Sequence, residues 1–466
     1  MRRSVLLYLT ALLLTSTLAC SLVKGLIPSP AQPALPTASQ GPAILLPTAE
    51  STSPPGLPAE TTPSASGDGL PISPEALAKM EEIEQQVITL RGLYPNRPSD
   101  RTLLSPDQLR QRVLDDFLGD YSLEEARDDT QVLALLGLLP ADFELLDFYI
   151  ELYSEQVAGY YDDEVKRMFV VGGEGFGGPE RLTHAHEFVH ALQDQNYDFQ
   201  GKMNFTDDAC EADSERCAGI RSLVEGDASL LEEQWARTYA AEQDIEEIIA
   251  FYDNLHTPVY DRAPEFMKQD FIFPYVQGSE FVRSLYLEGR WAGVDAAYQD
   301  LPLSTEQILH PDRYPEDKPR RLDLPDLTQA LGEGWREIDL NNLGEWYMRL
   351  TLMELLPEET AVKAAEGWGG DTYRAYHNDQ TGDSALVLVS SWDRMADAEE
   401  FFLALRDYGD QRIGRHEGDA KQLRWQSSDE GMLAERSSDQ VLWILAPDAD
   451  SLEDLRQAVA FPAKRE

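Results

Sequence analysis

The strongest structural signal in the chain is the stretch Leu182-Thr183-His184-Ala185-His186-Glu187-Phe188-Val189-His190-Ala191-Leu192. Its apolar residues recur at the spacing of a buried helix face, so a helix is predicted here. Residues four apart lie on one side of a helix. His186 and His190 can therefore present two imidazoles to a single divalent metal ion. Glu187 is adjacent to the first histidine and can reach the same ion without binding it tightly.

The spacing His-Glu-x-x-His predicts a hydrolytic zinc site. Its glutamate can take a proton from an attacking water and later deliver it to a leaving amine. The alternative is two solvent-facing histidines on an ordinary helix, but three of the seven histidines lie between Thr183 and His190. His184 lies two residues before His186, on roughly the opposite face. It is therefore predicted not to bind the ion and to have a surface or supporting role.

A catalytic zinc ion needs a third protein ligand and one position left open for water. The short metzincin motif requires glycine at position 193 and histidine at position 196, where this chain has Gln193 and Asn196. The third ligand is therefore expected on a later helix. Glu225 is preferred, because it borders the apolar helix face of Leu223–Leu231. The competing candidates are Glu211, Glu215, Glu232 and Glu233, which lie in denser charge.

The extended motif of residues 186–195 and the segment 224–228 resemble the gluzincin group of zinc metallopeptidases. In particular, they resemble a family of exported bacterial metallopeptidases with this extended helix. The resemblance implies that Zn²⁺ is held by His186, His190 and Glu225. It also implies that Glu187 is the general base, and that the helical region of residues 73–330 has a zincin-like fold.

The same resemblance implies an active-site cleft under an edge strand, a role that the predicted hairpin of residues 157–171 would fill. Many gluzincins carry an aspartate four residues after the glutamate ligand, where it orients a histidine. This chain has Ser229 there and Asp227 two residues earlier, so the motif does not settle which residue orients the ligands. A peptidase also needs a donor for the oxyanion. The candidates are Tyr275, His310 and Tyr314.

The N-terminus has the features of an export signal. Two arginines precede the apolar run Val5–Leu14, which is too short to span a bilayer comfortably as a mature helix. The following Thr17-Leu18-Ala19-Cys20 resembles a bacterial lipoprotein signal. It predicts a signal peptide of residues 1–19, lipidation of Cys20 and an extracytoplasmic, lipid-anchored protein. The alternative is an ordinary cleaved signal with an incidental cysteine, which would make the protein secreted.

Residues 20–72 are rich in Pro, Ser, Thr and Ala and are predicted to form an extended tether. Beyond Cys20 the chain has two cysteines, Cys210 and Cys217, which are predicted to form a disulfide. Such a bond is typical of proteins outside the cytosol. A cysteine-based metal site is the rival interpretation, but the cysteines are too few and no Cys-x-x-Cys occurs.

The formal net charge of −45 narrows the range of partners. Binding to nucleic acid or to anionic lipid through a basic face needs clusters of Lys and Arg. We therefore expect no nucleic acid partner, and membrane contact only through the lipid anchor. The charge is expected to serve solubility, because no Asp-x-Asp-x-Asp-Gly loop supports cation binding by an acidic loop. The predicted partner is a peptide or protein substrate.

The chain is long enough for two domains, and the patterns predict an α+β protein. Residues 73–330 are expected to form a mainly helical, zincin-like domain with a small antiparallel sheet. Residues 331–466 are expected to form a helical bridge and a small α+β domain, and the Gly-rich segment 366–371 a tight turn leading into its strands. Strands are expected at residues 372–377, 385–391, 421–426, 432–436 and 440–445, and helices at 340–356, 396–406 and 451–459.

The leading functional hypothesis is an exported zinc metallopeptidase that hydrolyses peptides or proteins at the cell envelope. A second hypothesis is a catalytically inactive, metallopeptidase-like scaffold with a structural zinc ion, which binds partners through its C-terminal domain. A solute-binding lipoprotein has the right anchor and acidity, but it has no use for His-Glu-x-x-His.

Overall fold

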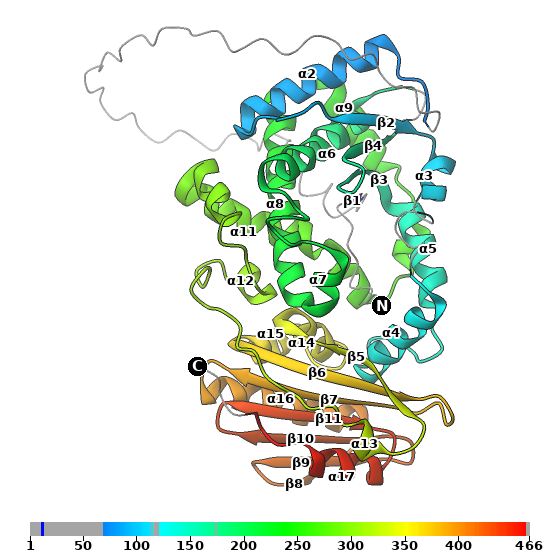
Figure 1. Ribbon diagram of the computed structural model, residues 1–466, viewed down its shortest axis with the longest axis vertical. Helices are drawn as coiled ribbons and strands as arrows, with labels where there is room; N and C mark the ends of the chain where they lie inside the picture. The colour runs from blue at the N-terminus through cyan, green and yellow to red at the C-terminus, as the bar shows by residue number, and fades with distance from the viewer. Residues whose placement is uncertain (1–10, 14–68, 113–114, 116–120, 173–174, 463–466) are drawn as a thin grey trace, which may run out of the picture.

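The computed structural model describes residues 11–13, 69–112, 115, 121–172 and 175–462 (Figure 1). The predicted lipidation site Cys20 lies outside the described residues, together with most of the predicted signal peptide and tether. Within the described part of the chain, none of the helices combines the length and the apolar character needed to cross a membrane.

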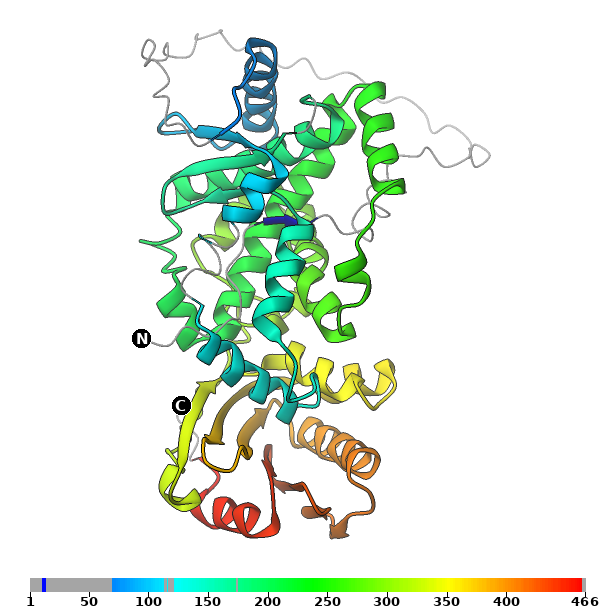
Figure 2. The same cartoon turned by 90° about the vertical axis from the view of Figure 1, so that its right-hand side faces the viewer.

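The molecule has the α+β architecture that the sequence predicts, with a helix-rich part stacked on a large sheet (Figures 1 and 2). The helices from residue 74 to residue 309 surround a small sheet in the upper part of both views. They are α2 (Pro74–Arg91), α3 (Pro106–Arg112), α4 (Leu123–Leu135), α5 (Leu145–Gln156), α6 (Gly178–Tyr197), α7 (Asp207–Ala212), α8 (Ser214–Tyr239), α9 (Glu242–Asp253), α10 (Pro258–Asp261), α11 (Glu265–Ala297) and α12 (Thr305–Leu309).

The small sheet has four strands in the order β1-β3-β4-β2. The predicted hairpin is present, because β3 and β4 pair antiparallel. The predicted small antiparallel sheet is confirmed in part: β3 pairs antiparallel with β1 and β4, whereas β2 pairs with β4 in parallel. Parallel neighbours need a long crossover connection, and α3, α4 and α5 lie between β2 and the hairpin in the chain. The strands are β1 (Ala11–Leu13), β2 (Asp100–Leu104), β3 (Val157–Asp162) and β4 (Arg167–Val171).

Helix α6 contains the His-Glu-x-x-His motif and lies at the centre of the upper part. It begins at Gly178, where Pro179 occupies the first turn and the Glu180 carboxylate accepts a hydrogen bond from the Gly177 amide. All of its residues from Leu182 to Tyr197 except Asn196 are nearly inaccessible to solvent, because α2, α8, α9 and the small sheet surround the helix. A helix enclosed on all sides keeps its polar side chains out of water, so each of them needs a partner.

Helices α8 and α11 cross at very short range. A Cβ atom on Gly226 would lie 2.1 Å from the carbonyl oxygen of Gly278, and one on Gly278 would lie 2.2 Å from that of Ser222. Any side chain at either glycine would force the two helices apart. At the start of α8, Cys210 and Cys217 form a disulfide that joins α7 to the first turn of α8.

The lower part is built on a seven-stranded sheet in the order β5-β6-β7-β11-β10-β9-β8, in which every neighbouring pair is antiparallel. Its strands are β5 (Trp335–Asn341), β6 (Trp368–Asn378), β7 (Ser384–Trp392), β8 (Glu417–Gly418), β9 (Gln422–Gln426), β10 (Gly431–Ser437) and β11 (Gln440–Ala446). Its helices are α13 (Thr328–Leu331), α14 (Gly344–Met353), α15 (Glu358–Ala365), α16 (Met395–Arg412) and α17 (Ala449–Ala458).

Both faces of the large sheet are covered, as its alternating side chains require. Leu386 and Leu388 belong to a core that α16 shares with the helix-rich part, whereas Val387 and Val389 face α17.

Two predictions for this region were wrong. The segment 366–371 is not only a turn, because β6 begins at Trp368, and residues 340–341 end a strand rather than begin a helix. The Asp371 carboxylate accepts hydrogen bonds from the backbone amides that start α14, which explains why the chain becomes helical only there.

Candidate metal centre

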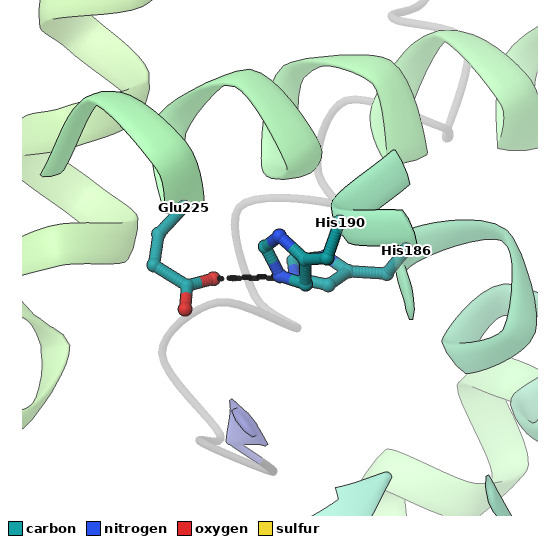
Figure 3. Close-up of side chains that lie close together, drawn as sticks. All are labelled: His186, His190 and Glu225. Atoms are coloured by element: carbon teal, nitrogen blue, oxygen red, sulfur yellow. Dashed lines mark hydrogen bonds and ion pairs between the residues drawn. The ribbon is translucent and has the colours of Figure 1, made fainter. Parts of the chain in front are cut away.

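Three residues that the sequence singles out converge in the middle of the upper part (Figure 3). His186 and His190 project from α6 toward Glu225 of α8, and all three side chains are fully buried. Oε2 of Glu225 lies 3.3 Å from Nε2 of His186 and 3.4 Å from Nε2 of His190. Both imidazoles thus direct the same nitrogen at one carboxylate oxygen.

These separations fit a tetrahedral zinc site. Zinc binds imidazole nitrogen and carboxylate oxygen at about 2.0–2.2 Å, and tetrahedral angles then put neighbouring ligand atoms about 3.3–3.5 Å apart. All three ligand atoms of this cluster lie within 4.8 Å of one another. Two histidines and one glutamate leave one corner of the tetrahedron for water, which is the donor set of a hydrolytic zinc centre. The residues present therefore fit zinc.

The far nitrogens of both histidines have acceptors. Nδ1 of His186 lies 2.8 Å from Oε2 of Glu232, and Nδ1 of His190 lies 2.8 Å from Oε1 of Gln193. When Nδ1 carries the hydrogen and donates it to these oxygens, each Nε2 presents its lone pair to the shared centre. The amide nitrogen of Gln193 in turn donates to the Val224 carbonyl oxygen at 3.0 Å, so α8 fixes this side chain.

Sequence reasoning did not identify either orienting residue. Glu232 was considered only as a competing ligand, and Gln193 only as evidence against a metzincin. A signal was present in both cases. Glu232 lies seven residues after Glu225, on the same side of α8, and Gln193 lies three residues after His190. The aspartate expected four residues after Glu225 has no counterpart, and Glu232 fills its role one turn further along.

Asp227 belongs to a buried network behind His190. Its carboxylate accepts a hydrogen bond from Gln193 at 3.1 Å and from Tyr298 at 2.9 Å. It also forms an ion pair with Arg91, the last residue of α2, at 2.8 Å between Nε and Oδ1. Burial opposes the charge of Arg91, but the pairing with Asp227 outweighs it and raises the pKa of the guanidinium. Helix α2 is thus connected to the metal centre through Asp227 and Gln193.

The electrostatics of the centre favour a bound cation. Burial tends to lower the pKa of His186, but its hydrogen bonds to Glu225 and Glu232 outweigh that effect and raise the pKa to about 10. Burial tends to raise the pKa of Glu225, but His190 and His186 lower it to about 2. The cluster therefore holds a proton between His186 and its carboxylates at neutral pH, and a metal ion can replace that positive charge.

The motif glutamate lies under strand β3. Glu187 is fully buried, and a Cβ atom on Gly159 of β3 would lie 3.5 Å from Cγ of Glu187 and 2.7 Å from Cγ2 of Thr183. The absence of a side chain at Gly159 lets the strand pass directly over the helix. The outer edge of β3 pairs antiparallel with β1, with Leu12 opposite Gly159. An extended segment can therefore lie along this edge, next to Glu187.

Of the three oxyanion candidates, only Tyr275 lies beside the cluster. Its ring centroid is 6.4 Å from that of His186, and burial raises the pKa of its hydroxyl well above the usual value. The hydroxyl therefore stays protonated and can donate. His310 instead pairs with Glu345 at 2.9 Å, and the Tyr314 hydroxyl donates to the carbonyl oxygen of Asp300.

The remaining candidates have other contacts. His184 is fully buried rather than on the surface, with Nε2 3.3 Å from the Glu84 carboxylate of α2, because α2 covers that face of α6. Glu215 is buried and accepts a hydrogen bond from the Thr305 amide, and Glu233 pairs with Arg283. Glu211 lies on α7 and is only partly buried.

Comparison with known proteins identifies one matching family. Residues 331–456, which form the large sheet and its helices, match a family described as a domain of unknown function, DUF8575. No curated protein matches the chain, and no solved structure does.

Proposed function

We propose that this protein is a zinc-dependent peptidase of the gluzincin type, with a zincin-like arrangement of β3, β4, α6 and α8. The observation that carries the proposal is the convergence of His186, His190 and Glu225 at tetrahedral spacing. The acceptors on both Nδ1 atoms add to it, because a hydrolytic zinc site needs its histidines held in one tautomer.

The residues around the cluster can supply the remaining chemistry. Zinc, when bound, supplies a Lewis acid that lowers the pKa of water and polarises the carbonyl of the substrate. The Glu187 carboxylate takes the proton of the attacking water and passes it to the leaving nitrogen as the C–N bond breaks. Tyr275 donates a hydrogen bond to the oxyanion. The substrate backbone takes the place of β1, which lies within the predicted signal peptide of residues 1–19, on the outer edge of β3. This pairing keeps the scissile bond over Glu187.

Export and lipid anchoring remain part of this proposal and rest on the N-terminal sequence. The disulfide between Cys210 and Cys217 supports an oxidising compartment, since such bonds are rare in cytosolic proteins. A substrate at the extracytoplasmic surface, either a peptide or a protein, follows from that location.

The test compares the wild-type protein with Glu187→Gln. Both proteins are expected to carry about one zinc ion, because Glu187 is not a ligand. Cleavage of casein and of unstructured peptides should fall by a factor of about 10²–10⁴ in the variant. Glu233→Gln is the matched control, because Glu233 pairs with Arg283 on the surface side of α8. Zinc in both proteins with cleavage in neither would instead support the inactive scaffold, and zinc in neither would remove the proposal.

A further inference from the structure

A cavity of about 160 Å³ lies between the two parts of the molecule. Helices α4, α5, α8 and α11 form one side of it, and β5, α14 and β6 form the other. Aromatic side chains make up much of the wall, and Phe273 and Trp346 meet across the boundary with ring centroids 4.5 Å apart. The cavity is therefore complete only when the helix-rich part and the DUF8575 domain are both present.

The cavity adjoins the candidate metal centre along two elements. Tyr275 lines it from α11, and the same ring faces His186. Arg221 lines it from α8, one helical turn before Glu225 and therefore on the same side of that helix. The Tyr275 side chain thus lies between the cavity and the metal centre and contributes to both.

The polar groups of the wall bind mainly to one another. The Asp270 carboxylate accepts hydrogen bonds from Nε1 of Trp346 at 2.9 Å and from the hydroxyl of Tyr347 at 2.7 Å. The Tyr373 hydroxyl donates to Asp339 in the same way. These pairs leave mainly aromatic and aliphatic surfaces facing the space, where an ionised side chain of a ligand would lose its hydration.

We propose that this cavity receives a bulky apolar side chain of the substrate, next to the scissile bond, and that the DUF8575 domain forms its far wall. The substrates are then peptides with a large aromatic or aliphatic residue at that position, and acidic residues are rejected there. This inference rests on the proposed peptidase function and adds to it the class of substrate and a role for the C-terminal domain.

The direct test locates the side chain by photo-crosslinking. Zinc-loaded Glu187→Gln protein is mixed with an unstructured peptide that carries benzoylphenylalanine, and the crosslinked residues are identified by mass spectrometry. Crosslinks are expected on α11, around Met267, and on α14, around Trp346, because both line the cavity. Excess of the same peptide with phenylalanine should compete, and the version with glutamate should not. Crosslinks confined to other surfaces would overturn the inference.

A second test fills the cavity from α8. Ala218 lines the space, so Ala218→Trp should reduce cleavage of a phenylalanine peptide about tenfold or more relative to an alanine peptide. Zinc content should not change. Ala218→Leu is the milder variant if the larger one does not fold, and Ala396→Trp, at an exposed position on α16, is the matched control.

The two proposals fail in different ways. A folded, zinc-containing Ala218→Trp protein with an unchanged substrate preference would refute the cavity while leaving the peptidase in place. Wild-type protein that binds zinc and cleaves none of the peptides would refute the peptidase.

Discussion

Two groups of three ligand-type side chains lie in the described part of the chain, and they differ in what fills their centres. The ligand atoms of His186, His190 and Glu225 lie within 4.8 Å of one another, and so do those of a second group, Glu306, Asp317 and Asp393. In the second group the guanidinium of Arg313 pairs with Glu306 and lies 3.2 Å from Asp393 and 3.8 Å from Asp317. This acidic cluster thus has its own cation.

The comparison shows that close acids alone do not define a metal site. Burial raises the pKa of Glu306 to about 9, with Glu345 adding to the effect, although Arg313 opposes it. The Glu306 carboxyl is therefore protonated at neutral pH even beside Arg313, whose charge is left to Asp393 and Asp317. Glu225 is just as deeply buried, but the two imidazoles lower its pKa to about 2, and it stays ionised. Only the candidate metal centre combines an ionised acid with ligands whose orientation is fixed by neighbours.

The largest expected effect is the loss of zinc when a ligand is removed from the first group. Glu225→Ala and His190→Ala should each reduce bound zinc from about one ion per chain to nearly none after dialysis. The reason is that two remaining ligands cannot hold the ion against water. Peptidase activity should disappear with it. Elemental analysis by mass spectrometry measures the zinc content directly.

Glu306→Ala, in the acidic cluster, is the control and should keep its full zinc content. Tight zinc in Glu225→Ala would show that another acid completes the site. Zinc loss in Glu306→Ala would mean that the acidic cluster is a metal site as well, and the distinction between the two groups would not hold.

The second effect concerns Arg313. Replacing it by methionine leaves the acids of the second group without their cation, and we expect the free energy of unfolding to fall by roughly 1–3 kcal/mol. This loss of stability is smaller than that expected for a fully buried ion pair, because the Arg313 side chain is 23% exposed to solvent. Thermal and urea unfolding measure the change, with Arg415→Met at an exposed position as the control. An unchanged stability would show that Arg313 is not needed to neutralise this cluster.

The third effect is smaller and concerns orientation. Gln193→Ala removes the acceptor of His190 Nδ1 without touching a ligand, and it should weaken zinc binding about 10–100-fold. Competition with a zinc chelator of known affinity gives the ratio. Gln195→Ala, on the same helix, should have no such effect, because Gln195 binds the backbone amides of Asn96 and Arg97 instead. Equal affinities in both variants would contradict an orienting role for Gln193.

The sequence predicts local features of this molecule well, and long-range ones only where a chemical constraint is present. The helix that contains the His-Glu-x-x-His motif and the hairpin of β3 and β4 both form where their residue patterns predict them. The parallel pairing of β2 with β4 was missed, because strand direction depends on the path of the intervening helices rather than on the strand residues. Likewise residues 340–341 were predicted to begin a helix, but pairing with β6 makes them the end of β5.

In the candidate metal centre, too, features set within one helix were easier to predict than features set by packing between helices. His186 and His190 share a helix, so their common direction follows from the spacing alone. Bringing Glu225 to them requires the packing of α6 on α8. Glu225 was preferred because it borders an apolar helix face, and the resemblance to gluzincins implied the same ligand. The burial of His184 could not be predicted either, because it depends on α2 lying across the other face of α6.

The smallest expected effect is the number of protons released when zinc binds to the candidate metal centre. Without metal, the His186 imidazole holds a proton between Glu225 and Glu232, with a pKa of about 10. Zinc needs the neutral ring, so binding at pH 7 should release about one proton, and the apparent dissociation constant should fall about tenfold per pH unit until the pH approaches that pKa. Calorimetry in buffers of different ionisation enthalpy measures this number. Glu232→Gln removes one of the three carboxylates that raise the pKa of His186, so the proton count at pH 9 should fall in this variant. A count of zero in the wild-type protein at pH 7 would mean that His186 is already neutral, and the positive charge proposed for the empty cluster would then be absent.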